Sequence, residues 1–332
     1  ALNNTLFGYK AGTAITTGDS NTCFGQQAGS AISTNGYTTC IGAGAGEENT
    51  AHNTVAVGNS ALTNNTTGAS CTAVGTEALK MNTTADGGTA LGHQALRNST
   101  VIRQTGVGAY ALKAATTGGY NTAVGYNACT DNTTAQFNCA FGQWALKANT
   151  VSDNNTAIGQ QALSSLTGGV QTDGMNTAVG AKAGDALTTG HNNILIGYEA
   201  AASAADVDDE ITLGNSSISA LRCQVTSISS LSDRRDKTDI NTLGLGLDFI
   251  NSLKPVKFKW QTRDGKGPKG FQAGFIAQDF QQVQKDYDAD YLNLVLESNP
   301  EKLEAAPGKL IPILVKAIQE LKMEIDTLKN NG

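Results

Sequence analysis

One short pattern of apolar and polar positions recurs along the first two thirds of the chain. A large apolar residue followed by glycine returns every 16 or 17 residues, with one longer interval of 21. Two positions before that apolar residue stands a β-branched residue or cysteine. Side chains alternate along a strand, so both positions lie on one strand face, which we expect to be the buried core. The glycines are Gly8, Gly25, Gly42, Gly58, Gly75, Gly92, Gly108, Gly125, Gly142, Gly159, Gly180, Gly197 and Gly214.

The residues after each glycine form a second pattern. The third one is alanine in twelve copies, from Ala11 to Ala200, and Ser217 in the thirteenth. Such uniform smallness predicts that another stretch of backbone approaches closely. The two residues in between vary freely, as at Gln143 and Trp144, so we expect them to face solvent.

A unit of about 17 residues cannot bury an apolar face alone, so its copies must stack on one another. The sequence therefore predicts a mainly β fold, a β-solenoid or β-roll shaft with about 17 residues per coil. Twelve intervals of about 4.8 Å give a rod roughly 60 Å long. Four extra residues within 166–175 predict a surface loop, and the many small-residue columns suggest that several chains pack around one axis.

Composition divides the chain near residue 206. Residues 1–205 carry 17 charged residues and no proline, whereas residues 206–332 carry 35 charged residues and all five prolines. A shift from about 8% to about 28% charge is too large for one type of domain. We predict a repeat shaft over 1–205, a neck over 206–231 and a small α+β domain over 232–332.

The chain ends in an apolar heptad pattern that predicts a coiled coil over about residues 310–329. Glu324 and Lys329 are placed to pair between chains, and Pro312 fits only within the first turn of the helix. Isoleucine at a with leucine at d formally favours two parallel strands. The seam residues are Ile311, Leu314, Ile318, Leu321, Ile325 and Leu328.

Charge and hydropathy exclude several partners. A net charge of −6 without a basic stripe argues against nucleic acid, whose binding depends on lysine and arginine neutralising phosphates. No run approaches 18 apolar residues, and the first residues lack the features of a signal peptide, so we expect no membrane insertion. The chain begins without methionine and already inside a repeat, which suggests a fragment or processed product.

Cysteines and histidines carry little chemical signal. The six cysteines have no metal-ligand spacing, so we interpret them as small buried residues, with a metal or disulfide site as the alternative. His52, His93 and His191 are isolated, which favours surface positions over function. We therefore predict no metal and no cofactor. The cysteines are Cys23, Cys40, Cys71, Cys129, Cys139 and Cys223.

Two glycine-rich stretches imitate phosphate-binding loops. Residues 41–46 are simply the third copy of the repeat. Residues 264–270 lack the spacing of a phosphate loop and lie between the strand-like runs 256–262 and 272–276, so we predict a hairpin turn.

Two further patterns allow a functional and a structural interpretation. The acidic run 208–210 could bind a cation or act on a glycan, but an isolated cluster more often belongs to a solvated neck. A threonine column on a solenoid also allows the hypothesis of ice binding, which needs an exposed, flat array of threonine side chains. We expect this column to be buried because Val55, Cys139, Ile194 and Ile211 replace threonine in it.

Two parts of the chain resemble known families. The pattern N-T-A-V-G-x-x-A-L, best seen at 121–128 and 155–163, resembles repeats of bacteriophage tail fibres and, more loosely, heads of trimeric autotransporter adhesins, over residues 1 to about 218. From Ser232 the chain resembles the endosialidase-type intramolecular chaperone auto-processing domain of phage tailspikes and tail fibres. Four ordered segments carry this second resemblance, at 232–240, 253–260, 274–279 and 314–321.

The second resemblance implies a homotrimer and single-turnover self-cleavage of the Leu231–Ser232 bond. Ser232 would be the nucleophile and Lys237 the general base, supported by Asp233, Arg234 and Arg235. Residues five apart do not share a helix face, so the pair needs a turn, or a lysine from another chain. The alternative is a structural serine beside a solvated lysine. No activity on external substrates is expected.

Together these observations predict a trimeric phage tail fibre, located on the virion tail and assembled in the host cytoplasm. Its partners would be an upstream fibre or tail component and a host surface receptor, a glycan or a protein. Identical repeats can pair one coil out of step, so a C-terminal trimer clamp would fix the register. The alternative is a cellular trimeric surface adhesin with the same module, distinguished by a membrane anchor upstream of Ala1.

Overall fold

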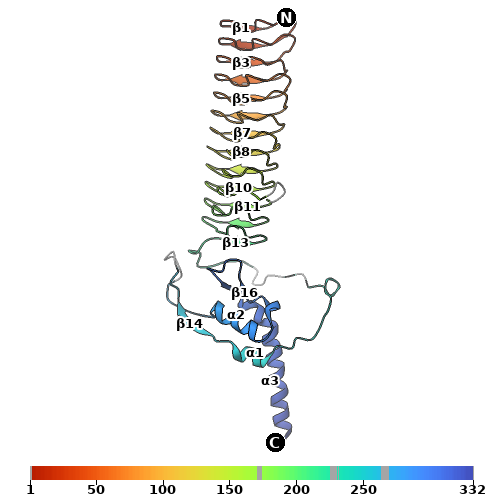
Figure 1. Ribbon diagram of the computed structural model, residues 1–332, viewed down its shortest axis with the longest axis vertical. Coiled ribbons are helices and arrows are strands. Elements are labelled where there is room, and N and C mark those ends of the chain that lie inside the picture. Colours follow the sequence, from red (N-terminus) through yellow and green to blue (C-terminus); the bar gives the residue numbers. More distant parts are fainter. Residues whose placement is uncertain (1, 170–173, 225–229, 231, 263–268, 332) are drawn as a thin grey trace. The chain divides into compact units, whose positions relative to one another are not determined.

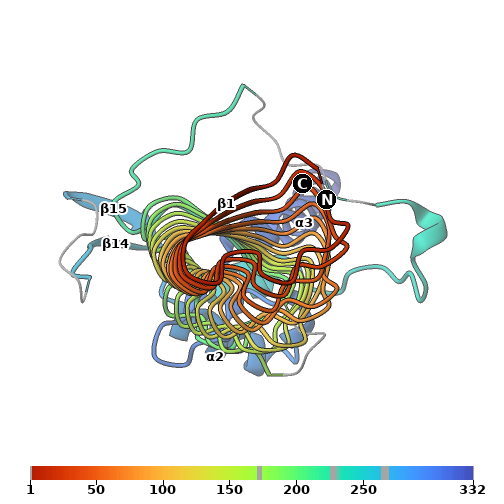
Figure 2. The same cartoon turned by 90° about the horizontal axis from the view of Figure 1, so that it is seen from above.

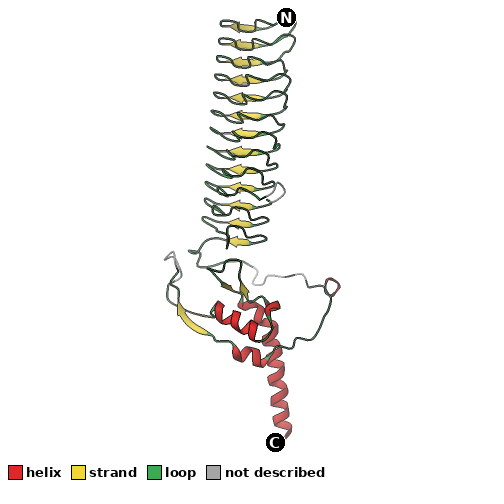
Figure 3. Ribbon diagram, viewed as in Figure 1, coloured by secondary structure: helices red, strands yellow, loops and turns green. Residues whose placement is uncertain are grey.

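The computed structural model describes the chain except for residues 1, 170–173, 225–229, 231, 263–268 and 332. The chain divides into two compact units, Ala1–Asn215 and Ser216–Gly332. The first unit is a stack of short strands, and the second is a smaller unit of helices and strands that ends in a long helix (Figures 1 and 3).

The first unit is a parallel β-solenoid, which confirms the predicted fold class. Its strands pair in sequence order, each in register with the next and without a crossover. Successive coils lie over one another with a small rotation when the stack is viewed along its length (Figure 2). The strands are β1 (Thr5–Phe7), β2 (Thr22–Phe24), β3 (Thr39–Ile41), β4 (Val55–Val57), β5 (Thr72–Val74), β6 (Thr89–Leu91), β7 (Thr105–Val107), β8 (Thr122–Val124), β9 (Cys139–Phe141), β10 (Thr156–Ile158), β11 (Thr177–Val179), β12 (Ile194–Ile196) and β13 (Ile211–Leu213).

The recurring glycine ends each strand in a conformation that a side chain would not allow. From Gly8 to Gly197 its φ lies between +123° and +143°. A Cβ at Gly142 would lie 2.3 Å from the carbonyl oxygen of Gly159 in the next coil. Glycine is therefore required both by the backbone angle and by the contact between coils.

Two columns of small residues line the inside of the coils, beside a column of buried leucines such as Leu62, Leu112 and Leu146. The alanine three residues after the glycine is buried in all twelve copies, as predicted. The middle residue of the strand also points inward, and Ala123, Ala140 and Ala157 are fully buried. A Cβ added at Gly106, which holds this middle position in β7, would lie 3.0 Å from Leu96 Cγ. The interior of β7 is therefore crowded even for a methyl group, because the buried Leu96 side chain packs against this glycine.

The prediction for the other strand face was wrong. The large residue before the glycine points out of the coil, and Phe24, Phe141 and Leu213 are 53–56% exposed. The β-branched residue two positions earlier is nowhere buried in β1–β13. A three-residue strand sends one side chain inward and two outward, and in β2–β12 the buried one is the middle residue. The burial argument against an ice-binding face is therefore also wrong, and thermal hysteresis of the repeats remains its test.

Buried asparagines form a ladder that the sequence analysis did not identify. Where asparagine stands four positions before the glycine, its side-chain oxygen accepts the backbone N–H of the corresponding residue one coil on, as in the run of coils from Asn121 to Asn193. Asn138 N donates to Asn121 Oδ1 and Asn155 N to Asn138 Oδ1, both at 2.9 Å. These bonds satisfy backbone groups inside the solenoid that would otherwise be costly to bury.

The structure bears differently on the two glycine-rich stretches, 41–46 and 264–270, and on the loop predicted within 166–175. Residues 41–46 are part of the third coil, as expected, since β3 ends at Ile41. The predicted loop within 166–175 lies partly outside the described residues, while Leu166 at its start belongs to the core. Around 264–270, β14 (Val256–Lys259) and β15 (Phe271–Gly274) pair antiparallel, as a hairpin requires, but residues 263–268 lie outside the described chain.

The second unit has a compact core of its own. It contains the 3-10 helix η1 (Arg234–Asp236), α1 (Leu247–Ser252), β14, β15, α2 (Ala277–Asp286), η2 (Asp290–Leu292), the short pair β16 (Val295–Leu296) and β17 (Glu304–Ala305), η3 (Pro307–Leu310) and α3 (Ile311–Asn331). The core comprises Phe249, Phe280, Val283, Ala289, Leu294, Val295, Leu310 and Ile313.

Helix α3 also caps helix α1. The Glu320 carboxylate accepts the Leu247 N–H at 2.7 Å and forms an ion pair with Lys316 at 3.2 Å. The Leu247 hydrogen bond, and secondarily Lys316, lowers the pKa of Glu320. A carboxylate at a helix N-terminus is favoured by the helix dipole, so this contact joins two helices 73 residues apart. Pro312 lies in the first turn of α3, as predicted.

We expect Ala128→Leu to destabilise the solenoid by about 1–3 kcal/mol per chain, because extra methylenes in a filled interior force the coils apart. Ala128 is fully buried. Urea unfolding of the repeat unit measures the effect, with Ala43→Leu at an exposed position as the matched control. Equal stability of the two variants would contradict the close packing described above.

The Glu320 cap predicts a pH dependence. The folded-state pKa is lowered, so the contact contributes stability above the ordinary glutamate pKa of about 4.3, and this contribution is lost as pH falls through the folded value. Glu320→Gln should therefore lower the urea midpoint of the second unit at pH 7 and flatten its decline toward pH 3. Glu324→Gln, on the same helix, serves as control, and parallel pH profiles for Glu320→Gln and wild type would refute the cap.

Candidate self-cleavage site and association surfaces

Ser232 and Lys237 lie together in the single chain. Helix η1 reverses the backbone between them, and Lys237 Nζ donates a hydrogen bond to Ser232 Oγ at 2.5 Å. The turn that the five-residue spacing required is therefore present, without a lysine from another chain. A serine hydroxyl within hydrogen-bond reach of an amine is the arrangement needed for base-assisted nucleophilic attack.

The residues between the pair hold this turn. The Asp233 carboxylate accepts the Arg235 N–H at 2.9 Å and receives Arg235 Nε and Nη2 at 3.0 and 2.6 Å. These bonds lower the pKa of Asp233 and raise that of Arg235. Arg234 contributes its carbonyl oxygen, which accepts the Lys237 N–H at 3.2 Å. Of the three predicted supporting residues, Asp233 and Arg235 act through side chains and Arg234 through its backbone.

The site is open to solvent. Every residue from 232 to 240 is exposed, and Leu231, on the other side of the predicted scissile bond, lies outside the described residues. A lysine serves as general base only when burial or neighbouring cations favour its neutral form. The described part of a single chain does not supply that burial, so its geometry positions the pair without enclosing it.

Helix α3 presents two distinct faces. Ile313 and Ala317 are buried against the rest of the second unit. All six seam residues lie on the remaining surface and are 41–74% exposed in the single chain. They form an apolar stripe of the kind that a coiled coil buries between helices. The stripe comprises Ile311, Leu314, Ile318, Leu321, Ile325 and Leu328.

The first unit carries a second apolar surface, formed by the outward side chains of β1–β13. The residue before each glycine is large and apolar in every strand, and Phe7 and Phe24 stack with ring centroids 4.9 Å apart. Exposed apolar surface that continues over many strands is unusual for a monomer. Both units therefore leave apolar surfaces uncovered in one chain.

The other candidate residues occupy structural positions. Cys23, Cys40, Cys71 and Cys129 are buried and unpaired, and burial raises the pKa of Cys129 to about 12. Cys139 is half-buried and Cys223 exposed. Within the described residues, no group of three or more histidine, cysteine or acidic side chains is arranged for a metal ion.

Histidines and the acidic run connect neighbouring coils. His52 Nδ1 accepts the Gly36 N–H at 3.1 Å, and His191 pairs with Asp208 at 2.8 Å. Asp209 accepts a hydrogen bond from Asn192 at 2.6 Å. His93 is exposed, with its ring against Tyr110. The acidic run thus bonds to the coil before it.

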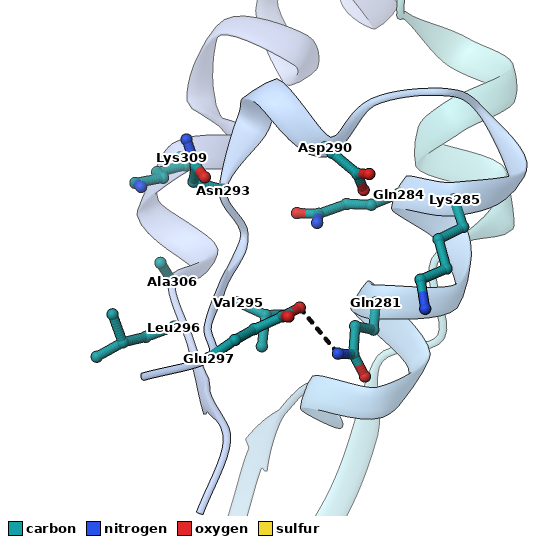
Figure 4. Close-up of a pocket in the computed structure, with 10 residues that line it drawn as sticks. All are labelled: Gln281, Gln284, Lys285, Asp290, Asn293, Val295, Leu296, Glu297, Ala306 and Lys309. Carbon is teal, nitrogen blue, oxygen red and sulfur yellow. Dashed lines mark hydrogen bonds between the residues drawn. The ribbon is translucent and has the colours of Figure 1, made fainter. Parts of the chain in front are cut away.

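A cleft of about 770 Å³ in the second unit was not anticipated (Figure 4). Its lining comes from α2 and from the separate segments around β16, β17 and η3, which no local sequence pattern connects. Gln281 donates to Glu297 across it at 2.8 Å, and Gln284 accepts the Leu294 N–H. Its charged lining residues are two lysines, Lys285 and Lys309, and two carboxylates, Asp290 and Glu297. The lining residues are Gln281, Gln284, Lys285, Asp290, Asn293, Val295, Leu296, Glu297, Ala306 and Lys309.

Comparison with known proteins gives one family match. Residues 232–288 match the family described as the chaperone of endosialidase. No curated protein and no solved structure matches the chain. None of the described helices is long and apolar enough to cross a membrane. The family match at 232–288 and the 13-strand solenoid fit a tail-fibre or endosialidase-type protein, fibre- or adhesin-like, with an intramolecular chaperone.

Proposed function

We propose that the chain is the host-attachment fibre of a phage tail and that its C-terminal domain directs trimerisation and folding. The observation that carries this proposal is the chaperone match at 232–288 behind a long solenoid. Residues 1–205 serve as the shaft, 206–231 as the neck and 232–332 as the chaperone. The fibre belongs to the virion tail outside the cell, joins an upstream tail component and meets a host receptor.

The uncovered apolar surfaces support a homotrimer, with which the chaperone match is consistent. In this proposal α3 associates with two copies of itself through the seam. The outward faces of β1–β13 then come together, because three parallel chains held at one end place equivalent coils at the same height. The repeats alone do not define this alignment, because two chains shifted by one coil would form equivalent contacts. In this proposal, association of the α3 helices fixes the alignment.

The proposed chemistry is a single self-cleavage. Lys237 takes the proton of Ser232 Oγ, which attacks the carbonyl carbon of Leu231. The Leu231–Ser232 peptide bond breaks, its nitrogen takes up a proton, and an ester forms on Oγ. Water hydrolyses the ester, leaving a carboxylate at Leu231 and a free hydroxyl at Ser232. Because both side chains are exposed in one chain, assembly supplies the burial that favours neutral lysine.

Leu321→Asp tests the seam. Three carboxylates on one axis should cost about 3 kcal/mol or more each, so the full chain should remain monomeric or aggregate. Light scattering with size-exclusion chromatography measures the mass. Met323→Asp is the matched control, since Met323 is an exposed apolar residue of α3 outside the seam. Normal trimers of Leu321→Asp would show that the seam does not drive assembly.

Ser232→Ala and Lys237→Ala test the cleavage. Each should slow release of residues 232–332 roughly 100-fold or more, because the nucleophile or the base is lost. Denaturing gels and the mass of the mature chain report the products. Lys254→Ala is the control, since Lys254 is an exposed lysine of the same unit outside the turn that holds Ser232 and Lys237. If wild type stays full length for as long as Ser232→Ala, the domain is a retained chaperone and not a peptidase.

A further inference from the structure

Ring side chains gather on a part of the solenoid that neither apolar surface includes. The two residues after each strand glycine are exposed or half-buried, and in the coils of β6–β9 they include the exposed His93 and Tyr126 and the half-buried Tyr110 and Trp144. The nine other coils hold only Tyr9 and Tyr198 at these positions. The cluster therefore occupies one level of the shaft and is not a property of the repeat.

The rings contact one another by their edges. The centroids of His93 and Tyr110 lie 5.2 Å apart at 85°, and those of Tyr110 and Tyr126 lie 5.9 Å apart at 81°. Lys113 Nζ lies 5.1 Å from the centre of the Tyr110 ring. Tyr126 is 45% exposed. Three successive coils thus present a continuous aromatic and cationic surface, about 10 Å from first to last strand.

The polar ends of this cluster are unused within the described chain. Neither the Tyr110 nor the Tyr126 hydroxyl has a hydrogen bond there, and no carboxylate pairs with Lys113. In the coils just before, Glu77 pairs with Lys80 at 2.7 Å and with Arg97 at 2.9 Å, which lowers its pKa to about 2. Glu77 offsets one of those two positive charges, whereas no carboxylate pairs with Lys113 within the described chain.

We propose that His93, Tyr110, Tyr126 and Lys113 form a binding site for an acidic saccharide. A sugar ring offers an apolar C–H face to an aromatic ring and hydroxyls to tyrosine and histidine, while a carboxylate on the sugar meets the ammonium group. Tyrosine suits such a site because it is rigid and amphipathic. This inference rests on the proposed attachment role and names the ligand class of the shaft.

The same local arrangement recurs two coils further on. The Lys113 N–H donates to the Tyr110 carbonyl, and the Lys147 N–H donates to the Trp144 carbonyl, both at 3.3 Å. An aromatic side chain with a lysine three residues later therefore appears twice, roughly 10 Å apart along the shaft. A linear saccharide lying along the rod would meet both pairs with successive units.

Other ligand classes fit the cluster less well. A net charge of −6 and only two such lysines do not provide the phosphate neutralisation that nucleic acid needs. A protein partner typically covers about 800 Å² on each side, far more than three coils of one turn present. A saccharide of a few units matches the height and chemistry of the surface.

Calorimetric titration of the full chain tests the site. The probes are oligomers of galacturonate, glucuronate and sialic acid, with maltohexaose as the uncharged comparison. At least one acidic oligomer should bind, more weakly as salt rises, and Tyr110→Ser or Tyr126→Ser should each reduce the affinity about tenfold. Lys113→Gln should remove most of the preference over maltohexaose. Tyr198→Ser, at the repeat position of Tyr126 but outside the coils of β6–β9, should bind like wild type.

Three binding results would overturn the proposal, and a change in self-association would be a fourth. The binding results are the absence of binding by every acidic oligomer, equal binding by Tyr110→Ser and wild type in thermally stable proteins, and equal affinity for maltohexaose. Loss of self-association in Tyr126→Ser would instead assign the cluster to contact between copies of the chain, which also overturns it. The trimer and cleavage experiments do not depend on this result.

Discussion

The contact between successive strand glycines is the constraint on which the rest of the solenoid depends. From Gly8 to Gly180, an added Cβ would lie 2.3–2.7 Å from the carbonyl oxygen of the next glycine in the column. The backbones therefore meet without an intervening side chain, which lets the N–H of Gly159 reach the Phe141 carbonyl at 2.8 Å. Because this contact recurs at the same place in every coil, it keeps three-residue strands in register and fixes which side chain of each strand points inward.

Because the middle residue of each strand points inward, the large apolar residue beside it is left uncovered in the single chain. The middle residue of each strand points inward, beside the buried alanine and a column of buried leucines such as Leu112 and Leu146, so the two flanking side chains of the strand point outward. An apolar stripe on a rigid rod would favour association with any similar stripe. A separate device that selects the partner and the register is then needed, and α3 with its exposed seam has the required form. The repeat geometry thus accounts for why a folding domain follows this shaft.

The sequence predicted the features that follow from the repeat period, but it did not predict which side chains of each strand point into the coil. Spacing alone identified the coils, the buried Ala128 and its equivalents, the paired strands around 256–276 and the terminal helix. It could not assign the inner face, because a three-residue strand carries too little alternation to distinguish inside from outside, and residue size proved misleading in so narrow a coil. The Asn121 to Asn155 ladder and the Glu320 cap went unrecognised, since asparagine is common in turns and the cap joins residues 73 apart. The turn between Ser232 and Lys237 was required by chemistry and not by any pattern.

In the proposed trimer, the exposure of Ser232 and Lys237 would have a chemical consequence. The two side chains already lie within hydrogen-bond distance in one chain, so the proposed assembly would not need to bring them together. What the single chain lacks is enclosure, which changes the balance between charged and neutral lysine without moving either residue. A cleavage reaction controlled in this way would start when neighbouring chains cover the turn between Ser232 and Lys237. It would therefore follow association of the chains and not simply synthesis of each chain. If the proposed cleavage releases the chaperone, the domain must act before that cleavage, and the solvent exposure of Ser232 and Lys237 in the unassembled chain would provide this order of events.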